Sequence, residues 1–169
     1  DQPRSRGLGD VYKRQRLAAN QARWHLDLGD VAGALTLATY GLGLAKRRNF
    51  NDEIALFLAL LARIALAEGG DPSAHLESIC DITARTGEME WIITAHLLTA
   101  RHALDIGDNQ AALAEAKLGL LHAETCGFGL LRIELLIALA RLRLAWPDPL
   151  AAIQALSLIH ISEPTRPRL

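Results

Sequence analysis

The stretch ARWHLDLGDVAGAL, residues 22–35, contains a pattern that returns three more times along the chain. The other copies are ARIALAEGGDPSAHL at 62–76, ARHALDIGDNQAAL at 100–113 and ARLRLAWPDPLAAI at 140–153. Each copy has Ala-Arg, a Leu three places after the Arg, and a turn that ends in Asp. The arginines are 40, 38 and 40 residues apart. Self-similarity at a fixed period of this length predicts a helical-repeat architecture.

The turn in each copy combines a helix end with a helix start. Gly29, Gly70 and Gly107 can take the left-handed conformation that ends a helix. The Asp after each Gly can accept hydrogen bonds from the free N–H groups of the next helix. Further stops lie at 49–51, 86–87 and 126–129, so each unit is predicted to hold two helices. The expected helices span 16–28, 30–47, 52–68, 71–86, 88–106, 108–125, 129–145 and from 148 onward.

The spacing of apolar residues agrees with this helical interpretation. In the segment 129–145 one helical face holds Leu130, Ile133, Leu136, Ile137, Ala140 and Leu144. Leu135, Leu139 and Leu142 form a second apolar face. A helix with two apolar faces is expected to be packed on both sides, as in the middle of a stack of repeats.

The two ends of the chain are expected to differ in origin from its middle. Residues 2–15 and 156–169 can be encoded by reverse-complementary DNA, for example Gln15 as CAG and Leu156 as CTG. This correspondence runs over fourteen codons, and both segments resemble the translated adapter of transposase-based sequencing libraries. We therefore expect residues 1–15 and 156–169 to be non-native tails, and residues 16–155 to be a repeat domain truncated at both ends.

The composition of residues 16–155 excludes several classes of protein. The tails hold six of the 18 Lys and Arg and three of the 19 Asp and Glu, which leaves twelve and sixteen, a net charge of −4. This segment therefore has no basic surplus for nucleic acid or an anionic membrane. The two cysteines, Cys80 and Cys126, are too few for a disulfide framework, which favours a reducing cytoplasm. We expect both to be buried thiols in the core.

The repeat resembles the tetratricopeptide repeat. Ala22, Ala62, Ala100 and Ala140 match the small residue in the first helix of that family, and Ala34, Ala112 and Ala152 match the small residue early in the second. His75 departs from this second position, the period is 38–40 residues, and the Trp, Tyr and closing Pro positions of the family differ. The resemblance implies an all-α fold, a right-handed α-solenoid of antiparallel helix pairs.

The same resemblance implies a function in binding other proteins. The long, Leu- and Ala-rich form looks like the repeat arms of large bacterial regulators. The fragment is therefore expected to be an interaction scaffold for a protein or peptide partner, without enzymatic activity or a cofactor. The alternative is a sensor or regulatory arm of a multidomain signal-transducing ATPase or transcription regulator. Sequence upstream of this chain would distinguish the two.

The recurrent arginines Arg23, Arg63, Arg101 and Arg141 are the candidate binding residues, and we call them the arginine series. In the related family this helix lines the concave groove, where four guanidinium groups could bind carboxylates of a peptide. The alternative, which we favour, is that each arginine bonds to a neighbouring helix, to carbonyl groups or to acids such as Asp27, Asp105 or Glu134.

Other polar residues do not form a recognisable site. The histidines have no Glu or Cys partner at the spacing of a metal site, so no metal is expected. No set of residues can be defended as catalytic. Gly41 and Gly119, each eleven places after its Asp, are expected to allow close packing of helices. The tryptophans Trp24, Trp91 and Trp146 could pack between units or present aromatic rings in a groove.

Overall fold

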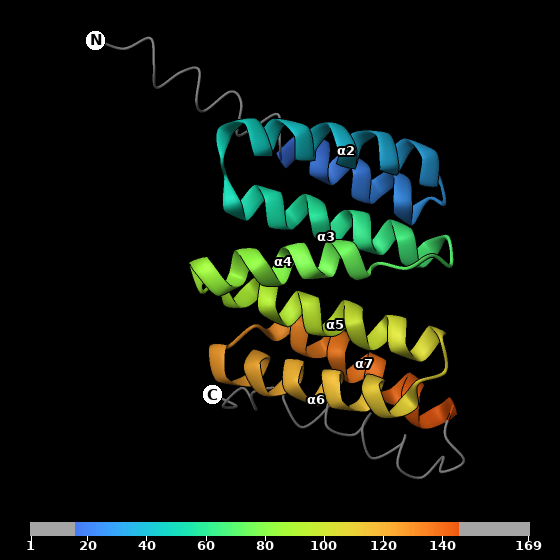
Figure 1. Ribbon diagram of the computed structural model, residues 1–169. Coiled ribbons are helices and arrows are strands. Elements are labelled where there is room, and N and C mark those ends of the chain that lie inside the picture. Colours follow the sequence, from blue (N-terminus) through green and yellow to red (C-terminus); the bar gives the residue numbers. More distant parts are fainter. Residues whose placement is uncertain (1–15, 146–169) are drawn as a thin grey trace, which may run out of the picture. The chain divides into compact units, whose positions relative to one another are not determined.

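The computed structural model describes residues 16–145, and within this range every regular element is an α-helix. An unlabelled first helix spans residues 16–27. It is followed by α2 (Val31–Arg48), α3 (Asn51–Ala67), α4 (Ser73–Thr86), α5 (Met89–Asp105), α6 (Asn109–Cys126) and α7 (Gly129–Ala145) (Figure 1). The prediction of an all-α fold is confirmed, and the helix ends lie within two residues of those expected from the sequence.

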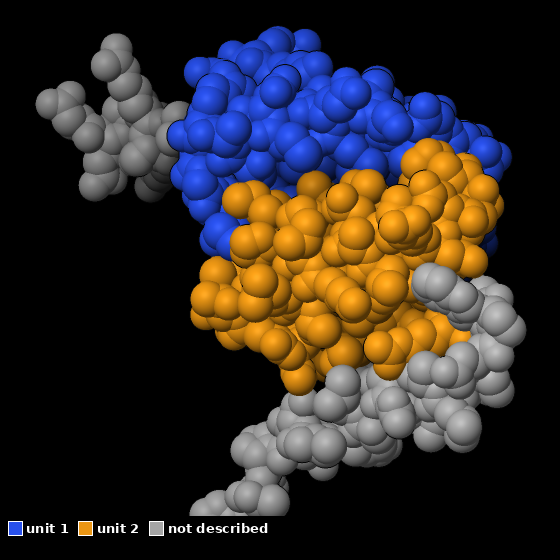
Figure 2. Space-filling model, turned by 60° about the horizontal axis from the view of Figure 1, so that its bottom comes forward, with its two compact units in different colours: residues 1–91 blue, residues 92–169 orange. Residues whose placement is uncertain are grey.

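The predicted tails, 1–15 and 156–169, lie outside the described residues, as does the helix expected from residue 148. The chain divides into two compact units, residues 1–91 and 92–169, with the boundary near the start of α5 (Figure 2).

The first and third turns have the predicted geometry. Gly29 and Gly107 are left-handed, with φ of 81° and 80°. The carboxylates of Asp30 and Asp108 accept hydrogen bonds of 2.9 Å from the backbone N–H groups of Gly33 and Ala111. These bonds satisfy N–H groups that a helix N-terminus leaves without a partner. Two turns 78 residues apart therefore have the same conformation.

The second turn differs from its prediction because it contains one extra residue. Gly69, with φ of 70°, takes the left-handed conformation that we expected at Gly70. Asp71 is followed by Pro72, which has no N–H, and its carboxylate accepts 2.9 and 2.6 Å hydrogen bonds from the backbone N–H and hydroxyl of Ser73. The helix α4 consequently begins at Ser73, two residues later than predicted.

The core of the first unit is built from small residues facing large ones. Alanines of the first helix and of α2 pack against aromatic and aliphatic side chains of α3. The residues of this cluster are Ala18, Ala19, Ala22, Ala34, Ala38, Ala45, Phe57, Leu60, Leu61 and Ile64. On its other side α3 packs against α4 (Figure 1). The buried residues of α4 are Leu76, Ile79, Ile82 and Thr83.

The second unit repeats this arrangement with α5, α6 and α7. Ala100 and Ala103 of α5 and Ala112 and Ala116 of α6 form one cluster with Leu139 and Leu142 of α7. Ile93 and Leu97 form a second cluster with Ala123, Leu135 and Ala138. The small residues that define the repeat, Ala22, Ala62, Ala100 and Ala140, are all buried. Small side chains at these positions allow the helix backbones to approach closely.

The buried residues of α2 and α6 correspond one to one. The helix α2 buries Ala34, Ala38, Gly41 and Ala45, and α6 buries Ala112, Ala116, Gly119 and Ala123. Each residue of the second set lies 78 places after its counterpart in the first. The expectation that Gly41 and Gly119 allow close packing is confirmed, because a Cβ atom at Gly41 would collide with the ring of Phe57. At Gly119 it would lie 2.9 Å from Leu135 Cδ2 and 3.0 Å from His96 Cβ.

One prediction about α7 is only partly correct. Leu135, Leu136, Leu139 and Leu142 are buried, but Leu130, Ile133, Ile137 and Leu144 are exposed. The described residues therefore cover the second apolar face of α7 and leave much of the first uncovered. We call the four exposed residues the open face of α7.

Candidate functional site

The four arginines of the series do not share one environment. In the first unit, Arg23 is exposed on the first helix and Arg63 of α3 is half-buried. In the second unit, Arg101 of α5 is half-buried and Arg141 of α7 is exposed. The two arginines with a described helix on either side in the chain are thus the less exposed ones.

Arg101 of α5 forms an ion pair with α7, the helix that occupies the same position in the next repeat. Its Nη2 lies 3.7 Å from Oε2 of Glu134 on α7, and the two side chains are 34% and 19% exposed. At this distance the contact is electrostatic rather than a close hydrogen bond. Pairing of the series with Glu134 was one of the structural contacts expected from the sequence, and it is confirmed for Arg101. A ligand-binding role for the series remains a prediction.

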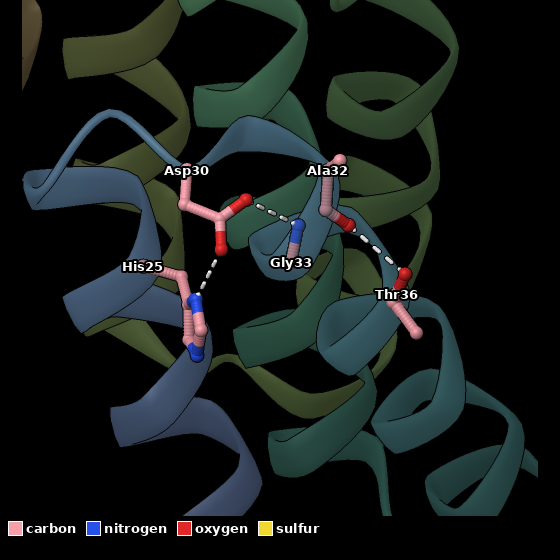
Figure 3. Close-up of polar contacts among 5 residues, drawn as sticks. All are labelled: His25, Asp30, Ala32, Gly33 and Thr36. Atoms are coloured by element: carbon pink, nitrogen blue, oxygen red, sulfur yellow. Dashed lines mark hydrogen bonds and ion pairs between the residues drawn. The ribbon is translucent and has the colours of Figure 1, made fainter.

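A small polar network fixes the turn before α2 (Figure 3). One carboxylate oxygen of Asp30 accepts the N–H of Gly33, and the other lies 2.7 Å from Nδ1 of His25. The Gly33 N–H and then His25 hold the pKa of Asp30 below its usual value. Gly33 leaves the space for this contact, because a Cβ there would lie 2.6 Å from His25 Nδ1. The sequence did not reveal this role of His25.

A second histidine cluster joins α5 and α6. Nδ1 of His96 lies 2.7 Å from Oε2 of Glu115, and its ring stacks on that of His122 with centroids 5.6 Å apart. Glu115 and His122 flank Gly119 on α6, one turn on each side, and Gly119 gives His96 room to approach. Sequence reasoning considered the histidines only as metal ligands and missed this contact. The sequence feature that could have predicted this contact is Gly119, which lies between Glu115 and His122 on one face of the helix.

Among residues 16–145, no group of three or more His, Cys, Asp or Glu has the geometry to hold a metal ion. His75 of α4 is partly buried, and this burial, with a smaller effect of Lys46, lowers its pKa. The last turn of α2 holds Lys46, Arg47 and Arg48, whose positive charges interact favourably with the negative end of the helix dipole.

The prediction that both cysteines are core thiols is wrong. Cys80 and Cys126 are exposed. Cys80 follows the buried Ile79, so it lies on the outer side of α4, and Cys126 is the last residue of α6.

The two described tryptophans differ in their surroundings. Trp91 is buried, and its Nε1–H donates a hydrogen bond to the carboxylate of Asp52 in the first turn of α3. Trp24 is 74% exposed on the first helix. It follows Arg23 directly, and Leu17 and Leu28 lie seven residues before and four residues after it. Trp146 lies outside the described residues.

No protein-family profile matches the chain, and no curated protein matches it. Within residues 16–145, none of the helices combines the length and the hydropathy that crossing a membrane requires.

Proposed function

We propose that this chain is part of a tetratricopeptide-type α-solenoid of antiparallel helix pairs that binds other proteins. The observation that carries the proposal is the one-to-one correspondence of α2 and α6. Their N-terminal caps, their left-handed glycines and their four buried small residues recur at an interval of 78 residues, or two units of 39. Stacked units of this kind generate extended surfaces, which such proteins use to bind partners.

Exposed apolar side chains support a role in protein binding. Leu17 and Trp24 lie on the first helix and Leu28 lies in the turn that follows it, and all three side chains are more than half exposed. Arg23, beside Trp24, is exposed as well. Exposed apolar side chains, an aromatic ring among them, beside a guanidinium group match the composition of protein-interaction surfaces, in which aromatic residues and arginine are enriched.

The charge and the thiols agree with a cytoplasmic protein-binding module. The net charge of −4 over residues 16–155 does not favour nucleic acid or an anionic membrane as the partner. Cys80 and Cys126 are exposed, and two cysteines are too few for a disulfide framework, which favours a reducing compartment. We therefore propose a cytoplasmic location, with a protein or peptide as the partner.

A displayed library of linear and helical peptides, selected against the full chain, tests this proposal. We expect enriched peptides to bind saturably in fluorescence anisotropy. Acidic peptides among them should lose affinity when Arg23 and Arg141 are replaced by Glu. Replacement of the same two arginines by Lys should largely preserve the affinity. A control substitution, Arg47→Glu in the last turn of α2, should have little effect. Failure of any peptide to enrich on a folded chain would contradict the proposal.

A further inference from the structure

The second helix of each repeat, α2, α4 or α6, leaves one face open to solvent. On α2 this face holds Thr36, Thr39 and Tyr40, which are exposed, and Gly43, which is half-buried, and we call it the outer face of α2. The residues at the same register positions on the two other helices are all exposed, and they are Glu77, Cys80, Asp81 and Ala84 on α4 and Ala114, Lys117, Leu118 and Leu121 on α6. Because α4 has described helices before and after it in the chain, this exposure is a property of the repeat and not of the limits of the described residues.

The outer face of α2 differs in chemistry from its counterparts. At these positions α4 carries Glu77 and Asp81 and α6 carries Lys117, which suits a surface in contact with water. In contrast, α2 has no charged residue from Val31 to Ala45, and the side chain of Tyr40 is 59% exposed. Tyrosine is enriched in protein interfaces, and charged residues are depleted at their centres. This composition indicates a surface that another protein covers.

Gly43 is an independent observation that points to the same surface. A glycine inside a helix lowers helix propensity, and at Gly41 the ring of Phe57 fills the space that the missing side chain leaves. A Cβ at Gly43 would have no neighbour within 4 Å. The same position holds Ala84 on α4 and Leu121 on α6, so the fold itself does not require glycine there. Glycine on an exposed helical face allows a second backbone to approach closely, which would account for its presence.

The charges at the two ends of α2 are opposite in sign. Asp27 and Asp30 precede the helix and are exposed, and its last turn, residues 46–48, consists of three exposed cations. The next acids, Asp52 and Glu53, lie in the first turn of α3, where they favour the N-terminus of that helix. Two copies of α2 packed antiparallel would bring the cations of each copy next to the acids of the other. The face is therefore self-complementary, as a two-fold symmetric interface requires.

We propose that the outer face of α2 binds the same face of a second copy of this chain, with the two helices antiparallel. A pair centred between Thr39 and Tyr40 places Gly43 of one copy opposite Thr36 of the other, so that two small residues meet at each close contact. Burial of Tyr40 contributes apolar contact, and the charges at the helix ends fix the orientation. This inference goes beyond the proposed function, because it concerns association of the chain with itself.

Sedimentation equilibrium of the full chain measures this association. We expect a concentration-dependent dimer whose dissociation constant rises with salt, because salt screens the charges at the helix ends. Tyr40→Lys, which places like charges near the two-fold axis, should raise the dissociation constant by at least about tenfold. The matched control is Leu118→Lys at the same register position of α6, 45% exposed, and it should change the constant by less than about twofold. Circular dichroism checks that each variant is folded.

Gly43→Gln separates association from folding. Glutamine favours a helix more than glycine does and the space at Gly43 is open, so the urea midpoint of the dilute chain should not fall. The dissociation constant should nevertheless rise by at least about tenfold, because the new side chain keeps the two backbones apart. An unchanged dissociation constant would show that no partner helix packs on Gly43 and would overturn the inference.

Disulfide formation tests the antiparallel arrangement. In a Cys80→Ser/Cys126→Ser background, Thr39→Cys places a thiol near the two-fold axis of the proposed dimer. This variant should form a covalent dimer under mild oxidation, because the two thiols come within reach of each other. The matched variant Lys117→Cys, at the same register position of α6, should not.

Three further outcomes would overturn the inference. The chain could remain monomeric at every concentration measured, or Tyr40→Lys and Leu118→Lys could weaken the dimer equally, which would place the contact elsewhere. A monomeric chain could also bind library peptides that protect the Thr39→Cys thiol from alkylation, which would assign the outer face of α2 to a different polypeptide. In that case the inference fails while the proposed function stands.

Discussion

Gly41 and Gly43 lie two residues apart in α2 and have opposite surroundings. A Cβ at Gly41 would collide with the ring of Phe57, whereas a Cβ at Gly43 would have no neighbour within 4 Å. Both glycines lower helix propensity by about 1 kcal/mol relative to Ala. At Gly41 this cost is offset by the packing of an aromatic ring directly on the helix backbone. At Gly43 the described structure contains no such compensation.

Alanine substitutions at these two glycines should therefore have opposite effects. Gly43→Ala should raise the free energy of unfolding by about 0.5–1 kcal/mol. Gly41→Ala should lower it by about 1–3 kcal/mol, because the phenyl ring must leave its place. Urea unfolding followed by circular dichroism measures both. Equal stabilisation by the two substitutions would show that Phe57 moves aside at little cost.

The pH dependence of stability should identify Asp30. Its pKa is lowered in the folded chain by the Gly33 N–H and by His25. A lowered folded pKa means that the stabilisation is present above the unfolded pKa and is lost as the pH falls through the folded pKa. Asp30→Asn should thus lower the melting temperature at neutral pH and reduce its fall between about pH 5 and the folded pKa.

The control for Asp30 is His25→Ala, which leaves the Gly33 N–H bond in place. It should remove only part of the effect, since the backbone bond is the larger cause of the pKa shift. A melting temperature of Asp30→Asn that falls as steeply in acid as that of the parent chain would argue against this assignment.

At the scale of helices, the ion pair between Arg101 and Glu134 links α5 to α7. The two groups are 3.7 Å apart and partly exposed, so solvent screens their attraction. A double-mutant cycle with Arg101→Met and Glu134→Gln should give a coupling energy of about 0.5–1 kcal/mol. Thermal unfolding at low and high salt measures it, and the coupling should shrink as salt rises. A coupling unaffected by salt would mean that the substitutions act through packing.

The helices themselves were predictable because their signals are local. Glycines in the left-handed conformation and capping aspartates act over three or four residues, so the turns at 29–30 and 107–108 follow directly from the sequence. The turn at 69–72 was placed less well, because either of two adjacent glycines could end the helix and Pro72 shifts the next one. Exposure of Cys80 and Cys126 was not predictable from their hydrophobic character, since it depends on which side of each helix meets a neighbour.

The candidate site was predicted less completely than the fold. The arginine series was recognisable from the sequence, and Glu134 was one of its predicted partners. The structure contains one such ion pair, between Arg101 and Glu134. Contacts between helices, such as His96 with Glu115 and His122, depend on the rotation of α5 relative to α6. A repeat period gives the order of helices along the chain but not these rotations, so such contacts emerge only from the structure.

At the scale of the whole chain, the two tails allow a last prediction. Because residues 2–15 and 156–169 can be encoded by fourteen reverse-complementary codons and resemble translated adapter DNA, we expect that they were not selected together with the repeats. Deleting 1–15 and 157–169 should leave the melting temperature within a few degrees of the parent value, and helicity per remaining residue nearly unchanged. Circular dichroism during heating measures both quantities. The control is a deletion of equal length that removes α2, and with it Ala34, Ala38 and Ala45. This deletion should abolish cooperative unfolding of the first unit, because these residues form much of its core. A melting temperature lowered substantially by the tail deletion would mean that the tails stabilise the repeats, and the domain boundaries at 16 and 155 would then have to be moved outward.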